Sequence, residues 1–139
     1  MSIRKPMKIL FFNRALRILL STNAFILLAA AMLGPIYAIY VEEIGGDLMD
    51  ASLASGLFAL TAGLTTFISG KYSDKIKENE LIIILGYTIM GTGFFLYNLV
   101  DSIGFLFCVQ ILIGFGEAIY SPAFDAVYSK HLDGHKSGK

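Results

Sequence analysis

The chain has 139 residues, of which 55% are hydrophobic and 16% are charged, and its formal net charge is zero. Its mean hydropathy of +0.67 excludes an ordinary soluble domain. The net charge itself says nothing about partners, because the charges are sorted along the chain, and we expect no nucleic-acid partner. A single cysteine, Cys108, excludes an internal disulfide and gives no metal cluster.

Four long apolar runs follow one another along the chain, at residues 18–41, 51–70, 81–100 and 103–128. Each has about 20 residues, the length that a helix needs to cross roughly 30 Å of hydrocarbon. We therefore expect an all-α membrane protein with a four-helix transmembrane region at 18–128. A basic segment, 1–17, precedes this region, and a loop, 129–139, follows it. The short connections predict that consecutive helices pack as antiparallel neighbours.

The first run begins after basic residues and contains Ala29-Ala30-Ala31, as a secretory signal peptide would. However, the apolar stretch continues for ten residues beyond Ala31, and similar runs follow it. We therefore favour a retained transmembrane helix.

Positive and negative charges are sorted along the chain. The eleven basic residues are Arg4, Lys5, Lys8, Arg14, Arg17, Lys71, Lys75, Lys77, Lys130, Lys136 and Lys139. The loops after the first and third runs carry only acidic charges, at Glu42, Glu43, Asp47, Asp50 and Asp101. Lys and Arg stay on the cytoplasmic side of a membrane because their translocation is disfavoured. The sorting predicts a multi-pass protein of the cell membrane with both ends in the cytoplasm.

The second run carries small residues on one helical face. The members of this small-residue stripe recur at spacings of four and three: Ser52, Gly56, Ala59, Gly63, Thr66 and Gly70. In lipid, small side chains let two helix backbones approach closely. The stripe is either ordinary packing inside one bundle or a smooth face that moves against another bundle.

The fourth run carries a polar stripe with the same spacings: Gln110, Gly114, Glu117, Ser121, Asp125 and Tyr128. Glu117 lies near the middle of its run, where a charged side chain costs about 2.5–3.5 kcal/mol on insertion scales, so it should face protein or water. Its carboxyl either binds a proton, a cation or a substrate, or serves as a structural hydrogen-bonding group. Asp125 is either a charge partner or a solvated charge near the helix end.

Two prolines interrupt the runs that carry polar groups, Pro35 in the first and Pro122 in the fourth. Proline removes a backbone hydrogen bond and bends a membrane helix, so a neighbouring group must satisfy the freed carbonyl. Tyr37 and Tyr40 lie just beyond Pro35, either as anchors at the membrane surface or at the mouth of a cavity.

Catalytic and metal chemistry have no visible basis in the sequence. His131 and His135 have a helical spacing, but the intervening Asp133-Gly134 is typical of a turn. There is no phosphate-binding loop, nucleophile–base pair or Cys/His cluster. We expect no enzyme activity, no cofactor and no metal.

The loop between the second and third runs carries a family resemblance. Its sequence, Gly70-Lys71-Tyr72-Ser73-Asp74-Lys75, resembles the signature loop of the major facilitator superfamily, Gly-x-Leu-Ala-Asp-Arg-x-Gly-Arg-Arg/Lys. Gly70 and Asp74 match and Lys75 keeps the charge, whereas Lys77 stands where the family has Gly. The segment from Gln110 to Ala118 is likewise similar to the Arg-x-x-x-Gly-x-Gly pattern of the family, with Gln110 in place of Arg.

This resemblance implies twelve spans in two six-helix bundles, which rock around a central cavity to give alternating access. The chain then represents an N-terminal fragment, the first four helices, and the missing C-terminal helices are its partners. The first and fourth helices line the cavity, with Glu117, Gln110, Ser121 and Tyr37 as candidates for contact with a small-molecule substrate or a coupling proton or cation. The residues of the cytoplasmic gate are Gly70, Asp74 and Lys75.

The resemblance makes a secondary active transporter the leading hypothesis, with efflux as the family-level direction. One alternative is a complete four-helix exporter like the small multidrug resistance proteins, whose essential Glu lies in the first helix. Here the first run has no acid before Glu42. The others are a non-transporting membrane scaffold, in which the polar stripe only holds helices together, and a membrane enzyme.

Overall fold

The computed structural model describes residues 14–73 and 78–133, and within these ranges every regular element is helical. The elements are α2 (Arg14–Leu33), the 3₁₀ turn η1 (Gly34–Ile36), α3 (Tyr37–Glu43), α4 (Leu48–Ser73), α5 (Asn79–Leu96), the 3₁₀ turn η2 (Tyr97–Leu99) and α6 (Ile103–Asp133). Four helical segments are long and apolar enough to cross a membrane, at residues 14–43, 48–71, 79–99 and 103–131. The predicted all-α membrane fold is confirmed.

The helices differ from the predicted runs mainly at their ends. The first segment is already helical at Arg14, the first described residue, whereas the predicted run starts at Ile18, and α4 begins at Leu48 rather than Ala51. Helix α6 continues beyond Tyr128, the last residue of the fourth run. A helix satisfies its own backbone groups regardless of side-chain polarity, so it continues into polar residues that hydropathy leaves out.

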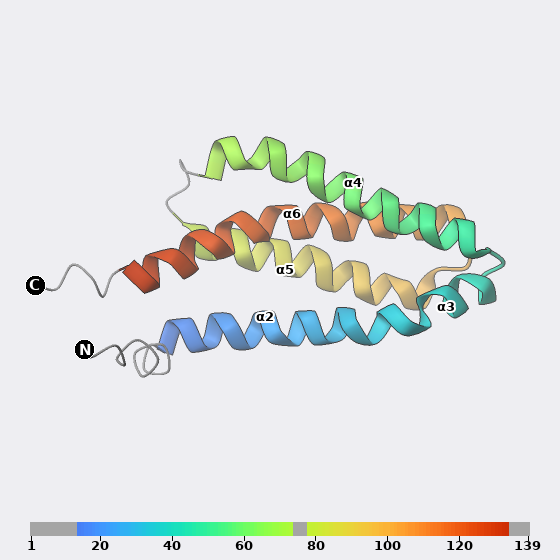
Figure 1. Ribbon diagram of the computed structural model, residues 1–139, viewed down its shortest axis with the longest axis horizontal. Helices are drawn as coiled ribbons and strands as arrows, with labels where there is room; N and C mark the ends of the chain where they lie inside the picture. The colour runs from blue at the N-terminus through green and yellow to red at the C-terminus, as the bar shows by residue number, and fades with distance from the viewer. Residues whose placement is uncertain (1–13, 74–77, 134–139) are drawn as a thin grey trace, which may run out of the picture.

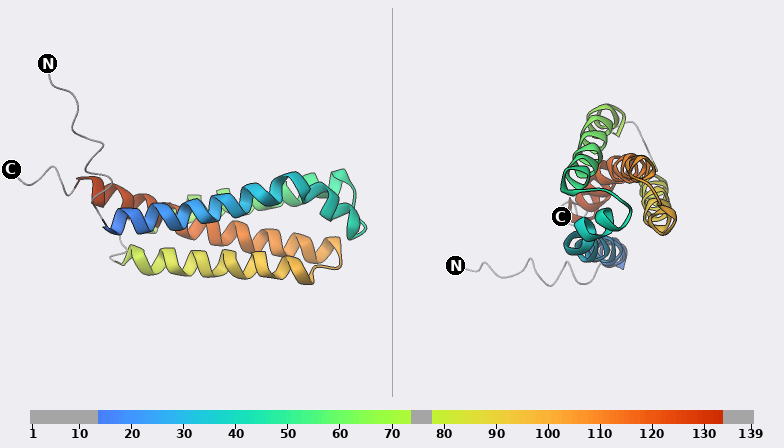
Figure 2. Two further views of the ribbon diagram at one scale, coloured as in Figure 1. Left: turned by 90° about the horizontal axis from the view of Figure 1, so that it is seen from below. Right: turned by 90° about the vertical axis from the view of Figure 1, so that its right-hand side faces the viewer.

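Helix α6 lies at the centre of the bundle, with α2, α4 and α5 around it (Figures 1 and 2). It packs extensively against both α4 and α5, which have few contacts with each other. The expectation that consecutive helices are neighbours is therefore correct for α5 and α6 but wrong for α4 and α5. A short connection fixes only where two helices end and begin, whereas side-chain shape decides which faces pack.

Glycines allow the close approach of α6 to its neighbours. A Cβ atom at Gly114 would lie only 2.6 Å from the carbonyl oxygen of Phe58 in α4. On the α5 side, a Cβ at Gly86 would lie 2.8 Å from the carbonyl oxygen of Gly116. Real Cβ atoms essentially never approach another heavy atom this closely, so glycine is required where these backbones meet.

The connection between α3 and α4 is a tight turn with its own hydrogen bonds. Gly45 adopts a positive φ of 88°, a conformation that favours glycine. The backbone N–H of Asp50 donates to the Asp47 carboxylate at 2.9 Å, and the N–H of Asp47 donates to the Asp50 carboxylate at 3.0 Å. This reciprocal pair satisfies backbone donors at the start of α4 and defines where that helix begins.

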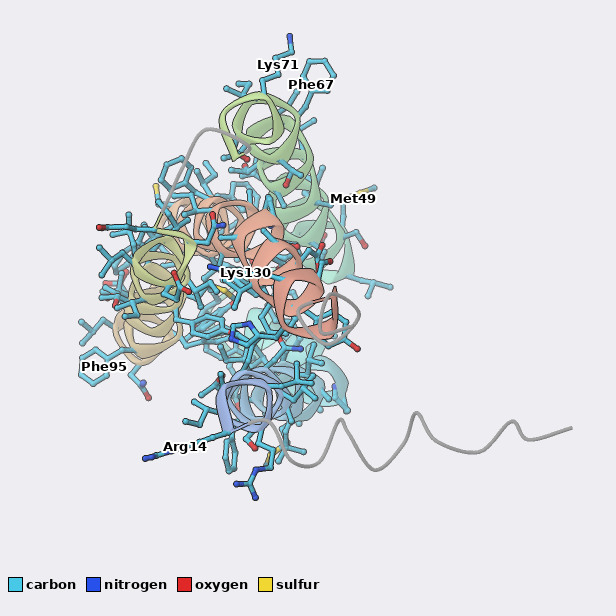
Figure 3. The ribbon with its side chains drawn as sticks, turned by 90° about the vertical axis from the view of Figure 1, so that its left-hand side faces the viewer. Arg14, Met49, Phe67, Lys71, Phe95 and Lys130 are labelled. Carbon is cyan, nitrogen blue, oxygen red and sulfur yellow. The ribbon has the colours of Figure 1, made fainter. Side chains whose placement is uncertain are left out.

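The charges sorted in sequence are also sorted in space. The first residue of α2 and the last residues of α6 lie at the same end of the bundle (Figure 1). Seen from that end, Arg14, Lys71 and Lys130 are its labelled basic residues (Figure 3). The turns that carry Asp47 and Asp101 lie at the opposite end. The described basic residues therefore gather at one end of the bundle, called the basic end here, where Glu78 and Glu80 also lie, whereas the turns at the opposite end carry only acidic charges.

Candidate functional site

A cavity of about 310 Å³ lies among the helices and touches all four membrane-spanning segments. Its walls are largely apolar and aromatic. The lining residues on which its chemistry depends are Tyr37, Phe58, Phe94, Tyr97, Gln110 and Glu117. Among the described residues that line the cavity, Glu117 alone carries a charged group. An apolar pocket with a few converging polar groups is the usual form of a small-molecule site.

The kink in the first segment helps to place Tyr37. Pro35 lies in η1, where a 3₁₀ turn separates α2 from α3. Because proline has no N–H, it interrupts the regular α-helical hydrogen bonds there. Both Gly34, within the turn, and Tyr37, directly after it, line the cavity. Tyr37 was expected either to anchor the helix at the membrane surface or to lie at a cavity, and its position in the structure agrees with the second alternative.

Gln110 and Tyr37 form the polar contact of this cavity. The Gln110 side-chain amide donates a hydrogen bond to the Tyr37 hydroxyl at 2.5 Å. Gln110 is only 6% exposed, so this bond satisfies a donor that water hardly reaches. Since the hydroxyl accepts this bond, its own proton is available to a ligand in the cavity.

A second tyrosine contact joins α3 to η2. The Tyr40 hydroxyl donates to the backbone carbonyl of Tyr97 at 2.8 Å, and the two rings meet edge to face with centroids 5.6 Å apart. Phe94 adds a further contact to Tyr97, with centroids 6.2 Å apart. Phe94 and Tyr97 of this aromatic cluster line one wall of the cavity. Tyr40 does not line the cavity itself but packs against Tyr97 and holds it in place.

Glu117 projects from the central helix into the cavity two turns along from Gln110. It is half-buried, while its neighbours Gly116 and Ala118 are buried against the other helices. No group in residues 14–73 and 78–133 hydrogen-bonds to its carboxyl or forms an ion pair with it. The alternative in which Glu117 forms a structural hydrogen bond to a neighbouring helix is therefore not observed among the described residues.

The remaining predicted residues lie outside the cavity lining. Ser121 is half-exposed one turn beyond Glu117 toward the basic end, and Asp125 is exposed one turn further on. Gly70 is exposed in the last turns of α4. Asp74 and Lys75, the other predicted gate residues, lie outside the described residues, as does His135. Within the described part, no group of three His, Cys, Asp or Glu side chains forms a metal site.

The small-residue stripe faces away from the other described helices. All of its members are exposed: Ser52, Gly56, Ala59, Gly63, Thr66 and Gly70. A Cβ atom at Gly56, Gly63 or Gly70 would meet nothing within 4 Å. Packing against α5 or α6 therefore does not explain the stripe, because α4 uses its opposite face, with Ala54 and Phe58, for α6.

Sequence reasoning missed several residues of the site. Ser55 and Phe58 of α4, and Phe94 and Tyr97 after it, line the cavity without having been singled out. Nothing in their type distinguishes them from aromatic and small residues that face lipid. The weak signal for Tyr97 is its place at the end of an apolar run, where its polar group needs a partner.

A family model described as Major Facilitator Superfamily matches residues 4–139, nearly the whole chain. The chain belongs to this superfamily. Its apolar helices, its central polar stripe and its signature-like loop are thus features of a major facilitator protein.

Curated relatives agree with this membership. The chain is 32% identical over 68 residues to the "Multidrug resistance protein MdtG" of Yersinia enterocolitica. This match covers 46% of the chain and 16% of that relative. The chain is also 31% identical over 97 residues to the "Uncharacterized MFS-type transporter MJ1560" of Methanocaldococcus jannaschii, covering 69% of the chain and 25% of that relative. The chain therefore spans a quarter or less of these proteins. No solved structure matches it.

Proposed function

We propose that this chain is part of a secondary active transporter, which moves a small organic solute across a membrane by alternating access. The observation that carries the proposal is the Glu117 carboxyl in an aromatic-walled cavity within the membrane-spanning region. A carboxyl that has no hydrogen-bond or ion-pair partner in the described part of the chain is costly within the membrane unless a proton, a cation or a substrate occupies it. Membership of a transporter superfamily supports the same conclusion.

In the proposed mechanism each polar group of the cavity has a different role. Glu117 exchanges a proton or contacts a cationic group, while the Tyr37 hydroxyl, held by Gln110, contacts a polar group of the solute. The walls formed by Phe58, Phe94 and other apolar side chains suit an apolar body. Ser121 lies farther along the same face of α6, where it serves a solute on its way toward the basic end.

Alternating access also needs a second bundle, and the small-residue stripe is the proposed surface for it. Its exposed glycines leave a smooth face on which another group of helices can slide or rock. Those helices are the proposed missing part of the same protein. In this scheme Gly70, Asp74 and Lys75 form the cytoplasmic gate, and Asp125 is a candidate charge partner near it.

The proposed orientation follows the sorted charges. The basic end, with Arg14 and Lys130, faces the cytoplasm, and the acidic end faces the other side of the cell membrane. We propose export as the direction of transport, since relatives of this chain are named multidrug resistance proteins.

The test is transport by the purified, full-length protein in liposomes with an imposed pH gradient. A panel of organic cations, neutral compounds and anions of similar size is offered, and accumulation of each is compared with that in protein-free liposomes. Gradient-driven accumulation supports a transporter. If no compound in the panel moves faster than through protein-free liposomes, the alternative of a non-transporting scaffold is favoured.

A matched pair of variants links the flux to the site. Glu117→Gln removes the cavity carboxyl, whereas Glu80→Gln removes an exposed carboxyl in the first turn of α5. We expect only the first to abolish or uncouple transport. Equal activity of both variants and the wild type would assign the flux to a different site.

A further inference from the structure

A proline inside the central helix leaves one backbone acceptor without its usual donor. Helix α6 continues without a break through Pro122. In a regular helix the N–H of residue 122 would donate to the carbonyl of Ala118, but proline has no N–H. Ala118 is 1% exposed, so water has little access to this position. A buried carbonyl of this kind requires a donor from elsewhere.

A serine of the neighbouring helix lies where that donor is needed. The Ser69 hydroxyl oxygen of α4 is 3.4 Å from the Ala118 carbonyl oxygen and 3.3 Å from the Thr66 carbonyl oxygen of its own helix. The Thr66 carbonyl has the regular helical donor, the N–H of Gly70. The Ala118 carbonyl has no such backbone donor, because residue 122 is proline. A hydrogen bond from the Ser69 hydroxyl therefore stabilises the protein more when it goes to Ala118 than when it goes to Thr66.

Other hydroxyls of α4 behave differently. Ser52 donates to the carbonyl of Leu48, and Thr61 donates to the carbonyl of Leu57, both one turn earlier in the same helix. Such bonds duplicate a helical acceptor that already has a donor. Among the α4 hydroxyls whose hydrogen bonds are described, Ser69 is the one that reaches another helix.

We propose that Ser69 is a positioning residue that tethers the end of α4 to the backbone beside the cavity carboxyl. Ala118 directly follows Glu117, so a bond to its carbonyl restrains the segment of α6 from which Glu117 projects. Ser69 also directly precedes Gly70, the first residue of the signature-like loop. The tether thereby connects the α4 end that leads into this loop to the carboxyl. Its relevance to transport rests on the function proposed above, whereas the tether itself does not.

A double-mutant cycle tests the tether through stability alone. Ser69→Ala is made in the wild type and in Pro122→Ala, and the unfolding equilibrium of the full-length protein is measured in detergent. In the wild type we expect Ser69→Ala to lower the folding equilibrium constant about fivefold, the worth of one hydrogen bond. In Pro122→Ala the new backbone N–H donates to Ala118, so removal of the serine hydroxyl should have almost no effect.

The controls separate this tether from general packing. Ser52→Ala should change stability equally in both backgrounds, and Ser69→Thr should keep the wild-type value because it retains the hydroxyl. If Pro122→Ala does not insert, Pro122→Gly also restores the N–H and takes its place. An equal effect of Ser69→Ala in both backgrounds would overturn the tether.

A second measurement tests the positioning of Glu117 without a known substrate. The carbodiimide N,N′-dicyclohexylcarbodiimide reacts with protonated carboxyls in apolar surroundings, and mass spectrometry of the full-length protein locates the modification. We expect Ser69→Ala to change the labelling rate at Glu117 severalfold and Ser69→Thr to restore it. Thr88→Val, which removes an intrahelical hydroxyl bond at an exposed position of α5, should leave the rate unchanged. An unaltered rate in Ser69→Ala would refute the positioning role, even where the double-mutant cycle shows coupling. Absence of transport by the wild type would instead count against the proposed function.

Discussion

The side-chain amide of Gln110 donates a hydrogen bond to the hydroxyl of Tyr37 at 2.5 Å, which joins the central helix α6 to the short helix α3. The two residues are 73 positions apart in sequence, and both line the cavity that contains Glu117. The bond holds a hydroxyl at the wall of the cavity and satisfies a buried amide at the same time. The same pair therefore serves stability and the proposed binding of a solute.

Removal of the Tyr37 hydroxyl should destabilise the protein through its partner. Tyr37→Phe leaves the buried Gln110 amide without its acceptor, which costs about 1–3 kcal/mol of unfolding free energy. In Gln110→Leu the amide is absent, so adding Tyr37→Phe should then cost much less. Denaturant unfolding in detergent measures all the variants, with Tyr128→Phe, near the other end of α6, as the control. Strictly additive costs would show that the hydrogen bond contributes nothing to stability.

Gly114→Ala should weaken the packing of α6 on α4. Its new methyl group would lie 2.6 Å from the Phe58 carbonyl oxygen, so the two backbones must separate. We expect a loss of about 1–3 kcal/mol, typical of overpacking. Gly104→Ala is the matched control, since a Cβ at Gly104 in the same helix meets nothing within 4 Å. Thermal unfolding measures both variants. If Gly104→Ala lowered the stability as much as Gly114→Ala does, the loss would come from replacing a glycine in α6 and not from the contact with α4.

Gly63→Leu should impair transport while leaving membrane insertion intact. A leucine here fills open space on the exposed stripe, so the described bundle itself is not strained. If a second bundle moves across this face, the bulky side chain obstructs it. The measurements are the initial rate of transport and the amount of protein in the membrane. Thr88→Leu, at an exposed position of α5, is the control. Wild-type rates in Gly63→Leu would mean that the stripe faces lipid.

The sequence was sufficient for the helices and for part of the site because helical periodicity is a strong signal. The seven-residue separation of Gln110 and Glu117 places them on one face of α6, and the structure brings both to the cavity together with Tyr37. Ser121 follows the same periodicity but lies one turn beyond the cavity, since periodicity gives the face of a residue and says nothing of where along the face a cavity ends.

The choice of neighbours could not be predicted in the same way. Periodicity identified the small-residue stripe of α4 as a contact surface, yet the helix glycines that pack inside the described bundle are Gly86, Gly93, Gly114 and Gly116. Small residues allow contact on any helix, so the identity of the partner depends on the shapes of both surfaces. For the same reason the central position of α6, between α4 and α5, was not apparent from the short loops.

Proton movement that accompanies transport tests the role of Glu117 most directly. The full-length protein is reconstituted in weakly buffered liposomes, a transported solute is added, and the pH change is recorded for the wild type and for Glu117→Gln. We predict a solute-dependent proton flux in the wild type and its loss in Glu117→Gln, since the amide cannot exchange a proton. A Glu117→Gln protein with the same solute transport and the same proton flux as the wild type would contradict the proposed coupling through this carboxyl.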